Sequence, residues 1–259
     1  METKAPPPPY RILILDTETN GLPKDRKAIK WQGYPAILQL AWTIKEVLYD
    51  YCSGEPLLSL KKVRDHHILL DPGIPWDTGA AAIHGITEEE ARNPKGRIST
   101  HEALHELTRD LYQVDCVLAH NLAFDKAIIE AACYRIMATT KPSEIPRSVG
   151  WPPQLAELCT MAATRDILKI PATAKQAKYS GLSPYKSPSL RELYVWLHDG
   201  EEWTGATHSA LGDVDCLGIC AEELLRRGIL EVLPEEGSGS GNERALTVVR
   251  PVVRPVVRP

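Results

Sequence analysis

The chain has 259 residues, a formal net charge of −4, 43% hydrophobic residues and 25% charged residues. This length supports one sizeable domain with a packed core and makes two full domains unexpected. The slightly acidic balance excludes a chain-wide attraction to nucleic acid, so any such binding must come from a local site. No apolar run approaches the roughly 20 residues of a membrane span, and the N-terminus lacks a signal-peptide core. We therefore expect no membrane association.

The two ends of the chain differ in composition from the rest. Residues 1–10 include four consecutive prolines and predict a stiff, unpacked lead-in. Residues 234–259 contain EEGSGSG and three copies of V-V-R-P, so we expect an extended, disordered tail. This tail is either solvated (or an added linker) or an arm that binds a partner or phosphate through Arg250, Arg254 and Arg258. The folded domain is then 11–233.

The hydrophobic pattern of this domain predicts strands first and then alternating helices and strands. RILILD (11–16) is typical of a central strand that is buried on both faces, and strands at 36–47 and 63–70 follow. We expect a helix over 101–113, a buried strand over 116–121 and a helix over 123–138. Residues 155–166 and 189–198 favour helices, with a short strand near Leu158 as the alternative. A final helix runs through Val214 and Leu224 and stops at Gly228. This order indicates an α/β sheet with helices packed on it.

Four carboxylates fall where the pattern predicts burial. Asp16 and Glu18 close the first strand as D-x-E, so period-two geometry places them on one face and Thr17 on the other. Asp125 lies in the first turn of its helix on the sheet-facing stripe, and Asp213 borders the core stripe of the last helix. Singly, each has a structural alternative as a turn or helix cap. Together they predict a site for two divalent cations, Mg²⁺ or Mn²⁺.

His208 precedes Asp213 by five residues, which is about 140° of rotation on a helix, so the two cannot share one helix face. If Ser209 caps the helix, His208 lies in the entering loop, where a neutral imidazole can accept a proton from an attacking water. The alternative interpretation is an exposed loop histidine without a role.

These residues form three ordered motifs, DTETNGL (16–22), HNLAFD (120–125) and HSALGD (208–213). In order and separation they resemble the exonuclease motifs of the DEDDh-type 3′–5′ exonucleases (DnaQ-like), a family that includes the proofreading epsilon subunit of DNA polymerase III. IHGIT (83–87) and PSLRELYVWL (188–197) are similar to this group as well. The resemblance spans nearly the whole folded domain, and it implies a ribonuclease-H-like fold with a five-stranded mixed sheet and helices on both faces.

The resemblance also implies roles for individual residues. Asp16 would contact both metal ions, Glu18 and Asp213 would hold the water-activating one, Asp125 would serve the second, and His208 would be the general base. The residues that would bind or surround the terminal nucleotide are Thr17, Thr19, Asn20, Gly21, Leu22, His84, Ile86, Asn121 and Phe124. The implied activity is removal of nucleoside 5′-monophosphates from a 3′ end. We expect that end to be single-stranded or frayed, because the site must hold an unpaired terminal nucleotide, and the cysteine pattern indicates a cytoplasmic protein.

Several questions stay open from the sequence. DNA is favoured over RNA as substrate, but recognition of a 2′-OH depends on contacts that a sequence does not place. Two basic stretches, 23–35 and 167–191, favour either a phosphate-binding surface or a solvated insertion. No polymerase-docking or clamp-docking peptide is evident, which leaves a proofreading partner unproven. The six cysteines include no C-x-x-C pair and predict reduced thiols.

Two rival functions remain. HEALH (101–105) fits the zinc-protease pattern H-E-x-x-H, although no third ligand follows and the segment also reads as a surface helix. The second rival is a non-catalytic nucleic-acid-binding module built on the same fold. Such a module would have no need for the complete set of acids and the histidine.

Overall fold

The computed structural model describes residues 9–23, 33–49, 52–139, 150–173, 184–232 and 249–251. Its main sheet has five strands in the order β3-β2-β1-β4-β5. They are β1 (Tyr10–Thr19), β2 (Ile37–Tyr49), β3 (Pro56–His67), β4 (Cys116–Ala119) and β5 (Ala156–Cys159). The pairs β1–β2 and β2–β3 are antiparallel, whereas β1–β4 and β4–β5 are parallel. The predicted five-stranded mixed sheet is confirmed.

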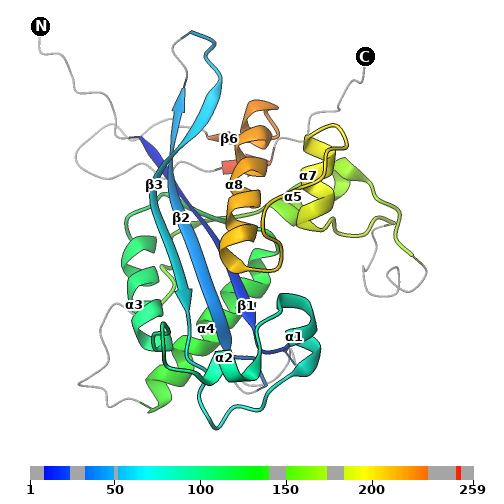
Figure 1. The fold of residues 1–259 in the computed structure, drawn as a ribbon. Helices are drawn as coiled ribbons and strands as arrows, with labels where there is room; N and C mark the ends of the chain where they lie inside the picture. The colour runs from blue at the N-terminus through cyan, green and yellow to red at the C-terminus, as the bar shows by residue number, and fades with distance from the viewer. Residues whose placement is uncertain are drawn as a thin grey trace, which may run out of the picture.

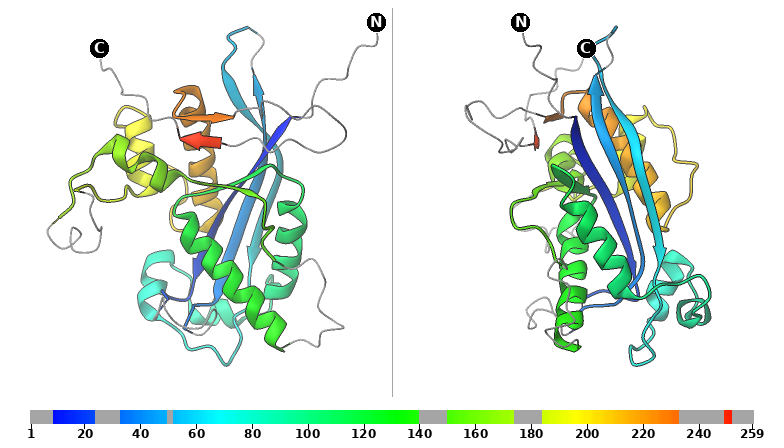
Figure 2. Two further views of the ribbon diagram at one scale, coloured as in Figure 1. Left: turned by 180° about the vertical axis from the view of Figure 1, so that it is seen from behind. Right: turned by 90° about the vertical axis from the view of Figure 1, so that its left-hand side faces the viewer.

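Helices cover both faces of this sheet (Figure 1; Figure 2, right). On one face, α3 (Thr100–Leu111) and α4 (Leu122–Thr139) pack against Leu13 and Leu15 of β1. On the other face, α8 (Ala210–Arg226), with α7 (Leu190–Leu197) and α5 (Thr160–Leu168) beside it, packs over Ile12 and Ile14. Because successive side chains of a strand point to opposite faces, one apolar run supplies both cores.

Two short helices lie beside the end of β1 (Figure 1). They are α1 (Thr78–His84) and α2 (Glu88–Arg92). A third, smaller core of Ala36, Leu38, Leu70, Ile86 and Ala91 joins them to the start of β2. This layer fixes the loop that follows β1.

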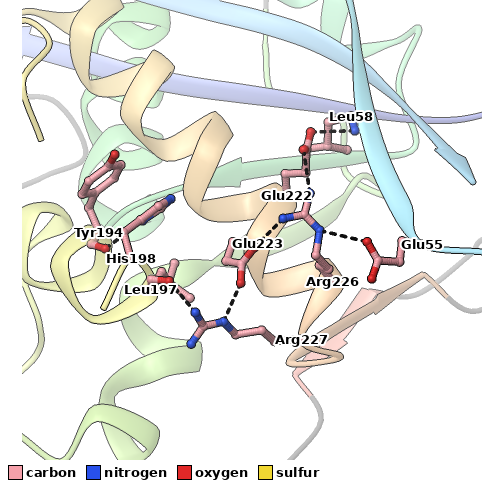
Figure 3. A network of polar contacts seen from close by, with 9 residues as sticks. All are labelled: Glu55, Leu58, Tyr194, Leu197, His198, Glu222, Glu223, Arg226 and Arg227. Carbon is pink, nitrogen blue, oxygen red and sulfur yellow. Dashed lines mark hydrogen bonds and ion pairs between the residues drawn. The ribbon is translucent and has the colours of Figure 1, made fainter. Parts of the chain in front are cut away.

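The C-terminal half of α8 is tied to neighbouring elements by polar contacts (Figure 3). Glu222 Oε2 accepts a 2.9 Å hydrogen bond from the backbone N–H of Leu58, at the start of β3. Arg226 forms an ion pair with Glu55 at 3.5 Å, and Arg227 donates to the carbonyl of Leu197 at the end of α7. These contacts hold the end of α8 that is remote from Asp213.

Two predicted elements need correction. The third strand was expected over 63–70 but runs over Pro56–His67, because its first half alternates too weakly in polarity to signal a strand. The helix expected over 155–166 is instead β5 followed by α5, since Leu158 is buried in the sheet beside Leu118 of β4. The short strand near Leu158, held as the alternative, is the observed one.

The tail and the basic stretches are only partly described. Val249–Pro251 forms β7, which pairs antiparallel with β6 (Leu230–Val232), so these three tail residues are extended but hydrogen-bonded. The remaining residues of 234–259, residues 1–8, and much of the basic stretches 23–35 and 167–191 lie outside the described residues. Among the described residues, no helix is long and apolar enough to span a membrane.

Candidate active site

Three carboxylates converge where the end of β1 meets the start of α8. Each of Asp16, Glu18 and Asp213 offers one oxygen, and these three atoms all lie within 4.8 Å of one another. Asp16 and Glu18 continue the row of Ile12 and Ile14, which is the row that α8 covers, so the predicted shared face is observed. All three residues are partly exposed. The cluster is therefore accessible from solvent.

The start of α8 places Asp213 and His208 as the sequence predicts. Ser209 is the N-cap, and its side chain accepts a hydrogen bond from the N–H of Gly212 at 3.2 Å. Asp213 lies in the first turn of α8, and His208 lies outside the helix with an exposed side chain. His208 lies close enough to the carboxyl of Asp213 to lower its pKa. His208 has a φ of 56°, the left-handed conformation, so a specific surrounding structure must hold it.

Asp125 approaches this cluster from the opposite face of the sheet. It lies in the first turn of α4 and is 2% exposed. Its Oδ1 accepts a 2.7 Å hydrogen bond from the hydroxyl of Thr17, the residue between the two β1 acids. Asp125 is not part of the group of three oxygens, but it is close enough to raise the pKa of Asp16.

All four acids have raised pKa values. Burial, followed by the charges of Asp125, Asp213 and Glu18, raises the pKa of Asp16 well above its ordinary value. Burial, followed by the charges of Asp213 and Asp125, raises the pKa of Glu18 to about 7, and burial raises the pKa of Asp125 to about 7. Burial also raises the pKa of Asp213, an effect that the nearby His208 opposes. Carboxylates that repel one another in this way attract a cation.

The ligand chemistry suits a hard divalent cation. The cluster offers only carboxylate oxygens, which Mg²⁺ and Mn²⁺ prefer, and no thiolate among the described residues is grouped with them. The residues present therefore fit the predicted metals. Which of the two is held depends on coordination that the carboxylates alone do not specify.

The loop after β1, expected to hold the terminal nucleotide, is fixed by internal contacts. The Thr19 hydroxyl donates to the carbonyl of Gly21 at 2.7 Å. Asn20 accepts from the N–H of Ala36 at 2.6 Å and donates to the carbonyl of Pro75 at 2.9 Å. Gly21 has a φ of 150° and lies against Asp77, so a side chain there would be strained. The backbone that leads to Leu22 is thus rigid.

The other predicted nucleotide contacts lie at three places. Leu22 is 75% exposed at the end of the β1 loop. His84 accepts a hydrogen bond from the N–H of Ile86 at 3.1 Å, and burial lowers its pKa, an effect that the backbone of Thr19 opposes. Asn121, with a φ of 81°, starts the turn into α4, and Phe124 packs onto the core under that helix. Their roles toward a nucleotide stay predictions.

Two supporting residues were missed by the sequence analysis. Thr17 stays a predicted nucleotide contact, and its hydroxyl also holds Asp125; its place on the other face of β1 was the available signal for this second role. Gln39 was not singled out, although it is one polar residue in the apolar run AILQLAW, and it contacts the first residue of α8. His120 joins the turn before α4 to Thr160 and to the carbonyl of Pro188, both at 3.0 Å.

No family model matches this sequence. No curated protein matches it either. Solved structures do match. Exonuclease I from Methylocaldum szegediense is 16% identical with a TM-score of 0.52, over 83% of this chain and 40% of that one. E. coli Exonuclease I in complex with single-stranded DNA is 18% identical with a TM-score of 0.55, over 85% and 41%. The nuclease domain of 3′hExo, a DEDDh family member bound to rAMP, is 13% identical with a TM-score of 0.53, over 85% and 94%.

The chain has the fold of the DEDDh-type 3′–5′ exonucleases. The predicted ribonuclease-H-like architecture is thereby confirmed. The chain spans about 40% of the length of the Exonuclease I structures and nearly all of the 3′hExo nuclease domain. At these identities the likeness concerns the fold, and activity has to be argued from the residues of this chain.

Within the DEDDh fold, HEALH forms part of α3, away from the three-acid cluster. Its glutamate, Glu102, belongs to the capping box of that helix with Ser99, and His105 is exposed. Among the described residues, the group able to hold a metal is Asp16, Glu18 and Asp213, and neither histidine of HEALH belongs to it. The surface-helix interpretation of HEALH is therefore the one the structure favours.

Proposed function

We propose that this protein is a divalent-metal-dependent 3′–5′ exonuclease, which hydrolyses phosphodiesters at the 3′ end of a nucleic acid strand. One observation carries the proposal: the oxygens of Asp16, Glu18 and Asp213 lie within 4.8 Å of one another beside the exposed His208. Asp125 adjoins them, and the fold is that of the DEDDh exonucleases. All five predicted catalytic residues are thus present in one region of the molecule.

The acids would hold two divalent cations, Mg²⁺ or Mn²⁺. The charges of Asp125, Asp213 and Glu18 each raise the pKa of Asp16, so Asp16 is near all three and would serve both ions; Glu18 and Asp213 would hold the water-activating one, and Asp125 would serve the second. Such ions, when bound, neutralise the phosphate and lower the pKa of the attacking water. The raised pKa values of the four acids support this arrangement, because each carboxylate gains most from a nearby cation when it is desolvated.

His208 is proposed as the general base. Its side chain is exposed at the edge of the cluster, so it can reach a water molecule that approaches the terminal phosphate. The water oxygen attacks phosphorus, a ring nitrogen of His208 takes the proton, and the bond from phosphorus to the 3′ oxygen of the preceding nucleotide breaks. That oxygen takes a proton from solvent. The products are a nucleoside 5′-monophosphate and a strand one nucleotide shorter with a free 3′-OH.

We propose single-stranded or frayed DNA as the substrate. The site must hold an unpaired terminal nucleotide, and the loop beside it is built by Thr19, Asn20 and Gly21. The polar side chains of Thr19 and Asn20 are used in contacts within the protein, which leaves them poorly placed to recognise a 2′-OH. RNA is the alternative that the assay below decides.

The test is a degradation assay on matched 5′-labelled oligonucleotides: single-stranded DNA, duplex DNA and RNA. We expect a ladder that shortens from the 3′ end in Mg²⁺ or Mn²⁺, with single-stranded DNA cut fastest. EDTA, a blocked 3′ end or Asp16→Asn should each stop it. Binding without shortening would instead establish a non-catalytic module, and shortening by Asp16→Asn at the wild-type rate would place the chemistry elsewhere.

The six cysteines are all free thiols. We propose, in keeping with this, that the protein works in a reducing compartment such as the cytoplasm. Fractionation of cells that express a tagged chain checks this, and recovery in an oxidising compartment would contradict it. Co-purification with the tagged chain would identify a polymerase or another protein partner.

A further inference from the structure

Gln39 is a buried polar residue in the middle of the sheet. It is 8% exposed and lies on β2 between Glu18 of β1 and His67 of β3, its direct register partners. Directly opposed residues of neighbouring strands point to the same face, so Gln39 lies on the face that α8 covers. Burial of an amide is costly unless both its ends are hydrogen-bonded.

Both ends of the Gln39 amide have partners. Oε1 accepts from the backbone N–H of Ala210 at 3.2 Å, and Nε2 lies 3.3 Å from Nδ1 of His67. A backbone N–H can only donate, so Oε1 must face Ala210, and the amide N–H then donates to His67. Ala210 is the first residue of α8, where backbone N–H groups have no partner within the helix. Gln39 therefore anchors that helix end to the centre of the sheet.

The segment before α8 is anchored on its other side as well. The indole N–H of Trp203 donates to the carbonyl of Ala206 at 3.0 Å. Gly212 packs tightly against the same carbonyl: a Cβ at that position would lie 2.5 Å from Ala206 O, so only glycine fits there. His208 lies between these two anchors in the left-handed conformation, which persists only where surrounding contacts impose it.

We propose that Gln39 is a positioning residue: its amide fixes the first turn of α8 and so sets His208 and Asp213 against Asp16 and Glu18. The catalytic part of this inference rests on the proposed exonuclease function. His67 serves it indirectly, since its Nδ1 selects the orientation of the amide that presents oxygen to Ala210. Gln39 contacts none of the reacting atoms in this scheme.

The chain supplies a matched control. At the far end of α8, Glu222 accepts from the N–H of Leu58 at 2.9 Å, which is also a bond between α8 and the sheet (Figure 3). Gln39→Met and Glu222→Met each remove one such bond with little change in side-chain length. Only the first removes it beside His208 and Asp213. Gln39→Glu keeps an acceptor for Ala210 and is the conservative variant.

The experiment measures amide hydrogen exchange and single-stranded DNA hydrolysis for the wild type and the three variants. We expect Gln39→Met to speed exchange over 206–213 and to lower kcat about 100-fold with KM nearly unchanged, since small misplacement of catalytic groups has this effect. Gln39→Glu keeps an acceptor for the N–H of Ala210 and should restore slow exchange over 206–213. Glu222→Met should speed exchange only near Leu58 and the end of α8 and should keep wild-type kcat.

Unchanged exchange over 206–213 in Gln39→Met, or equal loss of kcat in Gln39→Met and Glu222→Met, would overturn the proposal. A wild-type protein that hydrolyses no substrate would contradict the proposed function but not the anchoring role of Gln39. The exchange comparison would still decide whether Gln39 anchors the start of α8. If Gln39→Met fails to fold, His67→Phe removes the acceptor that orients the amide and is expected to have the same effects.

Discussion

Thr17 of β1 and Asp125 of α4 are joined, on the face of the sheet that α4 covers, by a 2.7 Å hydrogen bond from the threonine hydroxyl to Oδ1 of the aspartate. Asp125 is 2% exposed, so water hardly reaches its carboxylate, and the Thr17 hydroxyl supplies a hydrogen bond that water would otherwise give. The bond lowers the pKa of Asp125 against the larger effect of burial, which raises it to about 7. Thr17 thus helps to keep this acid ionised, which its proposed role as a metal ligand requires.

Thr17→Val should therefore impair activity at neutral pH. It removes the hydroxyl with little change in volume, so the pKa of Asp125 rises further and a smaller fraction is ionised at pH 7. We expect the activity to fall about 5-fold at pH 7, as a rise of one unit from a pKa of about 7 gives, and to recover as the pH is raised. The pH profile of kcat/KM measures this. Thr17→Ser should behave as the wild type.

Thr43 offers a control for the loss of a buried hydroxyl. It is 1% exposed in β2, and its hydroxyl has no hydrogen-bond partner among the described residues. Thr43→Val should leave the pH profile unchanged and should not destabilise the fold, because no bond is lost. Equal shifts of the profile in both variants would show that the Thr17 hydroxyl has no specific effect on Asp125.

Glu18 predicts an unusual dependence of stability on pH when metal is absent. Its pKa is raised to about 7 in the folded protein, so between its ordinary pKa and 7 the folded state binds more protons than the unfolded state. Stability in EDTA should therefore fall as the pH rises from about 4.5 to 7. We expect Glu18 to contribute about 1–2 kcal/mol, less than the full linkage value because solvent screens it. Urea unfolding at several pH values measures this, and Glu18→Gln should flatten the slope.

Added metal should reverse that loss. A cation that binds only the folded protein stabilises it by about 2.7 kcal/mol at a free concentration 100 times its Kd. We expect Mg²⁺ or Mn²⁺ to raise Tm at pH 7.5 and Asp213→Asn to reduce the rise, because Asp213 supplies one of the three clustered oxygens. Asp215, exposed two residues further along α8, is the control. A full metal response in Asp213→Asn would remove Asp213 from the metal site.

Sequence alone placed the acids but not their supports. Asp16 and Glu18 were placed on one face of β1 by simple alternation, and His208 was placed outside α8 because Ser209 is a good cap. The partners of Asp125 and Ala210 were not predictable, since Thr17 and Gln39 reach them across 108 and 171 residues of sequence. Such contacts depend on strand order and register, which local periodicity does not specify. A different limit applies to β5, which the sequence analysis assigned to a helix: its four residues are too few to show the alternation of a strand.

The fold itself depends on a buried charge on the face opposite α8. Asp110 of α3 is fully buried and accepts from the indole N–H of Trp42 at 2.9 Å and from Lys62 at 2.6 Å. Lys62→Met would leave this carboxylate with only the longer ion pair to Arg109, at 4.0 Å, so the loss of stability should be at or below the about 3–5 kcal/mol that is typical of a broken buried pair. We expect that loss in urea unfolding. The double variant Lys62→Met with Asp110→Leu should recover part of it, and a Lys62→Met protein as stable as the wild type would contradict the buried pair.

Substitution of His208, compared with substitution of the two histidines of HEALH, distinguishes the exonuclease interpretation from the zinc-protease interpretation. His208 borders the clustered acids, so His208→Ala should lower kcat by about 100- to 10,000-fold, the usual contribution of a general base, while binding of single-stranded DNA changes little. His101 and His105 lie on α3 and belong to no metal-binding group of the described residues. His101→Ala with His105→Ala should therefore keep wild-type nuclease activity. Steady-state hydrolysis and DNA binding in Ca²⁺ measure both, and nuclease activity that is lost with the α3 histidines but retained without His208 would reverse the assignment.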